Sequence, residues 1–194
     1  MEYVAATVIG YLIGSVPFAL MVARRHGVDL RRTADGNPGA WNALEQLGPR
    51  RALPAFLGDG AKGLAAGVAG WALGGFWGAW AGVAGAMIGH ALPAFAGFRG
   101  GKGVMTFVGG AIALSPLAAA GAAAVGVLAG ALSRSFARGA QAGVFAFPLV
   151  QLAIDSVVRV LATGALMTLI GALFALRRRS AVPATPETAA PPTT

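Results

Sequence analysis

The chain has 194 residues, of which 56% are hydrophobic and only 11% are charged. Soluble domains carry about 25% charged residues, and a soluble domain this short would expose large apolar patches. The composition excludes an ordinary soluble domain and predicts an all-α integral membrane protein, whose 30 glycines suit helices packed closely in lipid. The lack of cysteine in the sequence excludes disulfides, thiol nucleophiles and cysteine metal sites.

The net charge of +8 comes from basic residues that gather in short clusters between apolar runs. Nucleic-acid binding would favour basic and aromatic residues interleaved on one surface, and this sequence lacks that pattern. The clusters are instead typical of cytoplasmic loops between membrane spans.

The first apolar run, residues 3–23, is long enough to cross a bilayer of about 30 Å as one helix. Without a cleavage motif after it, it is expected to be retained and not removed as a signal peptide. Its Gly10 and Gly14 share one helix face, which favours close packing against another helix. After a polar stretch, residues 52–73 and 76–98 are predicted as the second and third spans.

The uncharged run 103–132 is too long for one span. Pro116 disfavours a helical conformation at Ser115, so two short spans are predicted on either side of this pair. Residues 139–154 and 160–176 complete a count of about seven transmembrane helices. These spans form one domain, residues 1–180, and the Pro/Ala/Thr-rich tail 181–194 is expected to be disordered.

Seven spans place most of the positive charge on one side of the membrane. The basic segments 24–51, 99–102, 133–138 and the tail from 177 then share a face, and of the 15 Lys and Arg residues only Arg159 lies opposite. The positive-inside rule therefore predicts an external N-terminus and a cytoplasmic C-terminus.

Three ionisable residues lie within predicted spans, where such groups are costly and often functional. Asp59 and Lys62 are three residues apart and share a helix face. They form either an internal ion pair near the membrane surface or part of an anion site. His90 is either a structural hydrogen-bonding residue or a participant in catalysis. The sequence has no His and carboxylate cluster that would predict a metal site.

Two glycine-rich loops, residues 35–42 and 98–106, could present several backbone N–H groups to one anion. A helix that starts directly after such a loop adds its positive dipole end, and Arg99 and Lys102 add full charges. These features favour a phosphate, although glycine-rich turns can also simply connect tightly packed helices. The second loop is not a nucleotide-binding P-loop, because Gly103 stands where a metal-binding hydroxyl should be.

Several short motifs occur in one order along residues 8–110. They are Gly14-Ser-Val-Pro-Phe18, Asp29-Leu-Arg31, Gly36-Asn-Pro-Gly-Ala40 with Asn42, Asp59-x-x-Lys62-Gly63, Gly89-His90-x-x-Pro93, and Phe98-Arg-Gly-Gly-Lys-Gly-Val104 with Thr106. Together they resemble the bacterial acyl-phosphate:glycerol-3-phosphate acyltransferase family (PlsY), a family of seven-helix plasma-membrane proteins.

The resemblance implies transfer of an acyl chain from acyl-phosphate to the 1-hydroxyl of glycerol-3-phosphate. The product would be lysophosphatidic acid for phospholipid synthesis, made at the cytoplasmic face. It also implies a soluble phosphate acyltransferase as the partner that makes the donor. No metal or cofactor is expected, so catalysis would depend on positioning and charge stabilisation.

The resemblance also implies roles for single residues. Asn37, Gly39 and Asn42 would bind phosphate and orient glycerol, while Asp59 and Lys62 would supply charge and hold it in place.

Further roles fall in the second loop and beyond it. Lys102 would neutralise the phosphate and Gly101 and Gly103 would offer backbone N–H groups. His90 would hydrogen-bond the substrate or assist proton transfer, and Arg134 would be a third phosphate contact.

The chain departs from the family's usual motifs at four places. Asp35 and Trp41 stand where the family usually has Ser and Thr, and Ala137 occupies a position aligned with a family serine. Leu176-Arg-Arg-Arg179 stands where the family has a His-x-x-Asn-type segment. A carboxylate about 4 Å from a phosphate costs about 4 kcal/mol at an effective dielectric constant of about 20. Pairing of Asp35 with Arg31 or Arg32 would remove much of this cost.

Three functions therefore stay open at this point. The first is a working acyltransferase, and the second is a non-catalytic relative that binds an anionic lipid or acyl-phosphate. The third is a small transporter of a phosphorylated metabolite, although the sequence has no visible inverted repeat.

Overall fold

The computed structural model describes residues 1–180, with side chains as far as Ala175. These residues form helices and loops without a strand, in the order α1 (Glu2–Gly14), α2 (Phe18–Arg25), η1 (Leu30–Arg32), α3 (Ala40–Ala91), η2 (Ala94–Ala96), α4 (Val104–Leu114), α5 (Pro116–Ser133), α6 (Phe136–Ile154) and α7 (Val157–Ser180). The predicted tail 181–194 and the side chains of Leu176-Arg-Arg-Arg179 lie outside this description.

The prediction of one continuous helix over residues 3–23 is wrong. The helix stops at Gly14 and resumes at Phe18, with Pro17 in a non-helical conformation between them. Proline lacks the N–H that would continue the helix, and it disfavours a helical conformation at Val16. The break leaves the carbonyl of Val16 without a helical partner and available to a side chain.

Helix α3 contains two of the predicted spans and begins earlier than expected. It starts at Ala40, inside the stretch predicted to be a polar loop, and turns at Gly48. Its second change of direction is at Gly74 and Gly75, in the gap between the predicted second and third spans. The expected third span ends at Ala91 instead of residue 98. The predicted division between Ser115 and Pro116 is confirmed as the boundary of α4 and α5.

Backbone-to-backbone contact joins α1 to α3. Gly10 lies against the main chain of Gly82, and Gly14 lies against that of Ala86, so a Cβ atom at either glycine would overlap the opposite backbone. The predicted packing role of Gly10 and Gly14 is confirmed. Small residues allow this close approach, and the two backbones then make van der Waals contacts along the interface.

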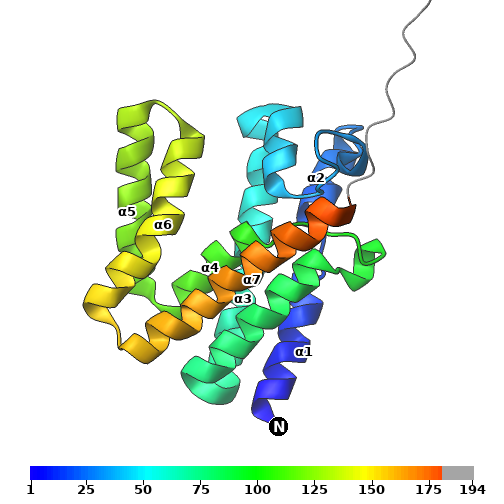
Figure 1. Ribbon diagram of the computed structural model, residues 1–194. Coiled ribbons are helices and arrows are strands. Elements are labelled where there is room, and N and C mark those ends of the chain that lie inside the picture. The colour runs from blue at the N-terminus through cyan, green and yellow to red at the C-terminus, as the bar shows by residue number, and fades with distance from the viewer. Residues whose placement is uncertain (181–194) are drawn as a thin grey trace, which may run out of the picture.

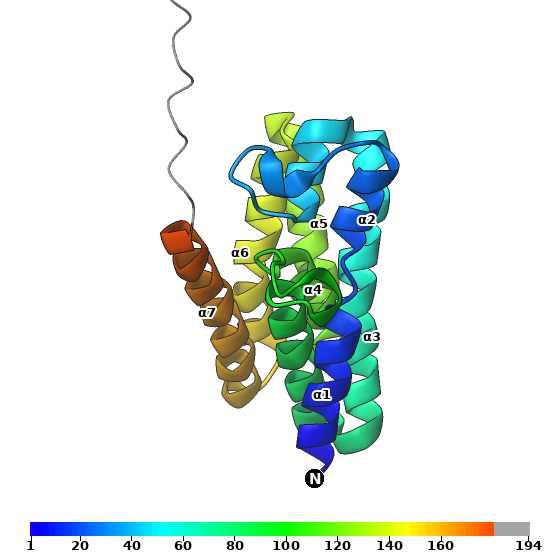
Figure 2. The same cartoon turned by 90° about the vertical axis from the view of Figure 1, so that its right-hand side faces the viewer.

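The hairpin of α5 and α6 stands to one side of this packed unit, and α7 crosses diagonally in front of α4 and α3 (Figure 1). After a turn of the view, α1 and α3 lie together at the right and α7 lies at the left edge (Figure 2). Within the described residues, four helical segments are long and apolar enough to cross a membrane, and they are Glu2–Arg25, Ala40–Ala96, Pro116–Ser133 and Val157–Ala175. Helix α4 has only 11 residues.

A buried polar cluster ties α4, α5, α6 and α7 together where α4 meets α5. Asp155 accepts hydrogen bonds from the Ser115 hydroxyl at 2.6 Å and from the Gln151 amide at 3.2 Å. Thr163 on α7 donates to Gln151, and both residues are fully buried. The base of the α5–α6 hairpin is therefore attached to its neighbours by hydrogen bonds.

Candidate functional site

A large cavity lies between the loop before α3, helix α4 and the α5–α6 hairpin. Its volume is about 1130 Å³ and most of its wall is apolar side chain from α4, α5 and α6. Eight of the ten predicted site residues line it, and they are Asn37, Gly39, Asn42, Asp59, His90, Lys102, Gly103 and Arg134. The cavity is thus amphipathic, with polar groups gathered from loops and apolar helices around the remaining volume.

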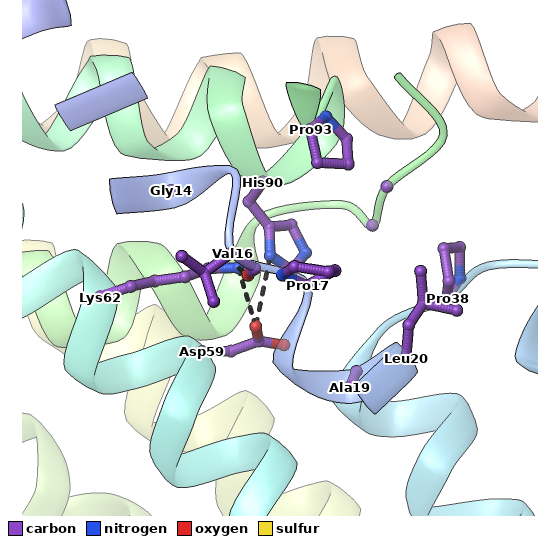
Figure 3. Close-up of a pocket in the computed structure, with 12 residues that line it drawn as sticks. Gly14, Val16, Pro17, Ala19, Leu20, Pro38, Asp59, Lys62, His90 and Pro93 are labelled. Atoms are coloured by element: carbon purple, nitrogen blue, oxygen red, sulfur yellow. Dashed lines mark hydrogen bonds and ion pairs between the residues drawn. The ribbon is translucent and has the colours of Figure 1, made fainter. Parts of the chain in front are cut away.

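The other two predicted residues, Lys62 and Gly101, lie in a small adjoining cavity of about 10 Å³, which Asp59 and His90 also line. Figure 3 shows the Asp59 carboxylate between the Lys62 and His90 side chains. Its Oδ1 is 2.9 Å from Lys62 Nζ and 3.5 Å from His90 Nδ1. The predicted shared face of Asp59 and Lys62 is confirmed, and all three side chains are buried.

Lys62 also stabilises the break between α1 and α2. Its Nζ donates to the Val16 carbonyl at 3.0 Å, which is the carbonyl that the break leaves without a helical partner. The same carbonyl accepts the Phe18 N–H at 3.1 Å, and the added bond from Lys62 links the shape of the first helical segment to the ionised cluster. The interpretation of Asp59 and Lys62 as an internal ion pair therefore describes what they do in this structure.

The second glycine-rich loop lies directly on His90. Any side chain at Gly101 would run into the imidazole Nε2, and one at Gly100 would overlap the His90 carbonyl. The N–H of Gly101 donates to that carbonyl at 3.0 Å. The Gly101 N–H was expected to bind a phosphate, but in this structure it is already bonded to the His90 carbonyl. The lack of a side chain at Gly101 instead allows the loop to lie against the imidazole.

Asn42 shapes the first glycine-rich loop from within. It is 2% exposed, and its amide donates to the carbonyls of Leu30, Thr33 and Asn37 at 2.9 to 3.2 Å. Its predicted contact with substrate stays a prediction, but these bonds already give it a positioning role. The side-chain oxygen of Asn37 is buried without a hydrogen-bond donor in the described part of the chain. It is therefore suited to accept a hydrogen bond from a ligand hydroxyl.

Asp35 pairs with Lys102, which corrects the expectation of a pair with Arg31 or Arg32. Lys102 Nζ is 2.7 Å from Asp35 Oδ2, and the other carboxylate oxygen accepts the Asn37 N–H at 3.1 Å. Arg31 instead reaches the second loop, where it donates to the carbonyls of Ala96 and Arg99. Partial burial alone would raise the pKa of Asp35, but Lys102 and the Asn37 N–H together hold that pKa below its ordinary value.

Aromatic residues surround the polar end of the cavity. Lys102 Nζ lies 4.5 Å from the centre of the Phe174 ring on α7, within the range of a cation–π contact. Trp41 stacks on Phe136 of α6 with ring centres 6.0 Å apart, and Phe56 meets the same ring edge-on. Trp41 fills the position where a small hydroxyl was expected and connects α3 to the start of α6.

Sequence reasoning missed these partners because they are distant along the chain. The Asp35 and Lys102 pair spans 67 residues, and no local pattern signals it. Phe136 lies two residues after Arg134, in a segment for which the sequence predicts a phosphate contact and no aromatic one. Arg134 does line the cavity, but it is exposed at the tip of the α5–α6 hairpin.

The sequence model of one family, described as glycerol-3-phosphate acyltransferase, matches residues 4–183 of this chain. Two relatives carry the same name. The one from Symbiobacterium thermophilum is 38% identical over 132 residues, which are 68% of this chain and 64% of the relative. The one from Geobacter sulfurreducens is 37% identical over 151 residues, which are 77% of each chain.

Solved structures give the same result. A crystal structure of PlsY, an integral membrane glycerol 3-phosphate acyltransferase, in its glycerol 3-phosphate form superposes with a TM-score of 0.75 and 28% sequence identity. The match covers 93% of this chain and 90% of that one. The lysophosphatidic acid form of PlsY matches with a TM-score of 0.73.

Proposed function

The chain belongs to the glycerol-3-phosphate acyltransferase family, and on this premise we propose that it transfers an acyl chain from acyl-phosphate to glycerol-3-phosphate. The observation that carries the proposal is the amphipathic cavity. Lys102, Arg134 and the unpartnered oxygen of Asn37 line a volume that is otherwise walled by apolar helices. The product, lysophosphatidic acid, joins a phosphate and a free hydroxyl to one long hydrocarbon chain, and it matches this division.

In the proposed reaction the 1-hydroxyl oxygen of glycerol-3-phosphate attacks the carbonyl carbon of acyl-phosphate. The bond from that carbon to the phosphate oxygen breaks, and inorganic phosphate leaves with the hydroxyl proton. Acyl-phosphate is already activated, so the chain need only align the reactants and stabilise charge. Lys102 and Arg134 hold phosphate, and Asn37 and Gly39 position the glycerol.

His90 is the group placed to assist the proton transfer. It lines the cavity, and Asp59 contacts its Nδ1, so the ring orientation is constrained. We therefore assign the buried Asp59 and Lys62 pair to the support of His90 and the second loop, and not to direct contact with substrate.

The proposal places seven spans in the membrane, with the N-terminus outside and the C-terminus and active site on the cytoplasmic side. The loop 26–39, the hairpin tip and the end of α7 lie toward the upper side of Figure 1, and the N-terminus lies at the lower side. The short α4 would occupy only part of the bilayer, because 11 residues of helix extend about 16 Å. A soluble enzyme that supplies acyl-phosphate is the partner this reaction requires.

The test is a direct assay of the protein purified in detergent. Wild-type protein is incubated with palmitoyl-phosphate and labelled glycerol-3-phosphate, and lysophosphatidic acid is measured. We expect product from wild type and a rate about 100-fold lower in Lys102→Ala, which is about 3 kcal/mol of lost charge stabilisation. The matched control is Arg50→Ala, which removes an exposed cation that does not line the cavity.

Absence of product from folded wild-type protein, with a family enzyme active in the same assay, would overturn the proposal. The non-catalytic relative that binds an anionic lipid or acyl-phosphate would then be the better interpretation.

A further inference from the structure

Lys102 has an anionic partner within the protein itself. Its Nζ is 2.7 Å from Asp35, and its side chain is only 20% exposed, so the ammonium has limited freedom to turn elsewhere. Asp35 is held as well, because its second oxygen accepts the Asn37 N–H. Both members of the pair are therefore held at the cavity mouth, although the Asp35 side chain itself is 56% exposed.

The other carboxylates of the cavity do not play this part. Glu45 accepts the Trp41 indole N–H at 2.8 Å, and Asp59 is paired with Lys62. Asp35 is therefore the carboxylate whose charge bears directly on Lys102 in the described part of the chain.

A phosphate that binds Lys102 comes close to Asp35 by geometry alone. The N–H bonds of an ammonium diverge at the tetrahedral angle, so two acceptors on one nitrogen lie about 4.5 Å apart. Two anions at that distance repel each other, and the phosphate shares a cation that is already partly neutralised. This repulsion weakens the binding of an incoming phosphate and favours the dissociation of a bound one.

We infer that Asp35 is a resident counter-ion of Lys102 that weakens phosphate binding and thereby sets the acceptor affinity and the ease of product departure. This inference rests on the proposed function in one respect, namely that Lys102 receives a substrate phosphate. Asp35 sets affinity in this account, because it changes the binding of every phosphate-bearing ligand and takes part in none of the bonds that are made or broken.

The most informative variant is Asp35→Asn. An asparagine side-chain oxygen can still accept the Asn37 N–H and keep the turn, so the substitution removes the charge with little change in shape. Inorganic phosphate is the probe, titrated by calorimetry against detergent-purified protein. We expect its Kd to fall about fivefold in Asp35→Asn, the upper end for a solvent-exposed ion pair.

Two controls separate this effect from a general change of charge. Glu45→Gln removes a cavity carboxylate that does not contact Lys102, and its Kd for phosphate should stay within about twofold of wild type. In a Lys102→Ala background, Asp35→Asn should tighten phosphate binding by clearly less than in wild type, because the cation that the carboxylate partly neutralises is gone and only the direct repulsion between carboxylate and phosphate remains. Equal tightening in that background would overturn the inference.

Kinetics give a second readout. The KM for glycerol-3-phosphate and the inhibition constant of inorganic phosphate should fall together, by about the same factor, in Asp35→Asn. An unchanged or weaker Kd for phosphate in that variant would overturn the inference. The calorimetric result needs no turnover, so wild-type protein that fails to form lysophosphatidic acid would contradict the proposed function and leave this test intact.

Discussion

The two sides of the cavity are built in different ways. On one side α1 and α3 meet through glycines whose backbones touch, and this unit carries Asp59, Lys62 and His90. On the other side the α5–α6 hairpin is tightly packed within itself, with Gly126 against Gly139. It meets α4 through an apolar contact of Phe107 with Phe147, and the large cavity lies between the remaining parts of these helices. Asp59, Lys62 and His90, whose mutual distances matter for the site, thus lie on the side where the helices are packed backbone to backbone.

The hairpin has attachments near its two ends. Near its base, Gln151 and Asp155 join the hydrogen-bonded cluster with Ser115 and Thr163. At its tip, Phe136 meets Trp41. A binding space for a hydrocarbon chain requires volume and apolar walls but no exact side-chain geometry. The α5–α6 hairpin can therefore line it with fewer attachments to the rest of the protein.

The largest effect is expected where backbones touch. Gly85→Leu should abolish the folded protein, because a side chain there would overlap the main chain of Thr7 and Tyr11. The matched control is Gly171→Leu on α7, where nothing lies within 4 Å of a new Cβ. The measurement is the fraction of monodisperse protein after detergent extraction. A folded, active Gly85→Leu protein would contradict the view that this side has no spare space.

The polar cluster at the base of the hairpin should give the next largest effect. Thr163→Val leaves the buried Gln151 side-chain oxygen without its donor and should cost about 1–3 kcal/mol of stability. Thr168→Val is the control on the same helix, since the exposed Thr168 hydroxyl only donates to Gly164 within α7. Thermal unfolding of both variants in detergent decides the matter, and equal midpoints would show that the cluster does not hold the hairpin.

The apolar end of the cavity should select the acyl chain by length. Ala119 lines the cavity whereas the neighbouring Ala120 does not, so Ala119→Phe shortens the available volume and Ala120→Phe is its control. We expect kcat/KM for palmitoyl-phosphate to fall about tenfold in Ala119→Phe, which is about 1.4 kcal/mol, with little change for decanoyl-phosphate. An equal loss for both donors would place the hydrocarbon chain elsewhere.

The two sides also differ in how well the sequence predicts them. Glycine spacing predicted the packing face of α1, and the three-residue spacing of Asp59 and Lys62 predicted their shared helix face, because helix geometry relates residues three and four apart. Their pairing was one of two interpretations that this spacing left open. Pro116 predicted the boundary of α4 and α5 through its effect on Ser115. All of these signals are local.

What the sequence did not predict depends on tertiary contact. Pro17 follows the same rule as Pro116, but the long apolar run around it favoured one helix. The break is stabilised by two bonds to the Val16 carbonyl, one from the Lys62 ammonium and one from the Phe18 N–H. Asp35 had two arginines nearby in the sequence, yet it pairs with Lys102 because the two glycine-rich loops meet in space. Residues 40–47 looked like polar loop, although they form the start of α3.

The smallest expected effect concerns the aromatic contact at the hairpin tip. Trp41 is 42% exposed and Phe136 is 61% exposed, so their stacking should contribute about 0.5–1.5 kcal/mol, and Trp41→Thr should lower the unfolding midpoint by a few degrees. Trp41→Phe keeps a ring against Phe136 while it loses the bond to Glu45, and it should recover most of that midpoint.

A double-mutant cycle of Trp41→Thr with Phe136→Ala measures the contact itself, since it removes effects that each residue has alone. A coupling energy near the lower end of the expected range would mean that contacts at the base, including the buried polar cluster, stabilise the position of the hairpin more than the contact at its tip does. The cavity mouth would then open more readily than its base, at the end where Asp35 and Lys102 lie. Coupling above about 1.5 kcal/mol would instead make the tip as firm as the base and contradict the comparison drawn between them.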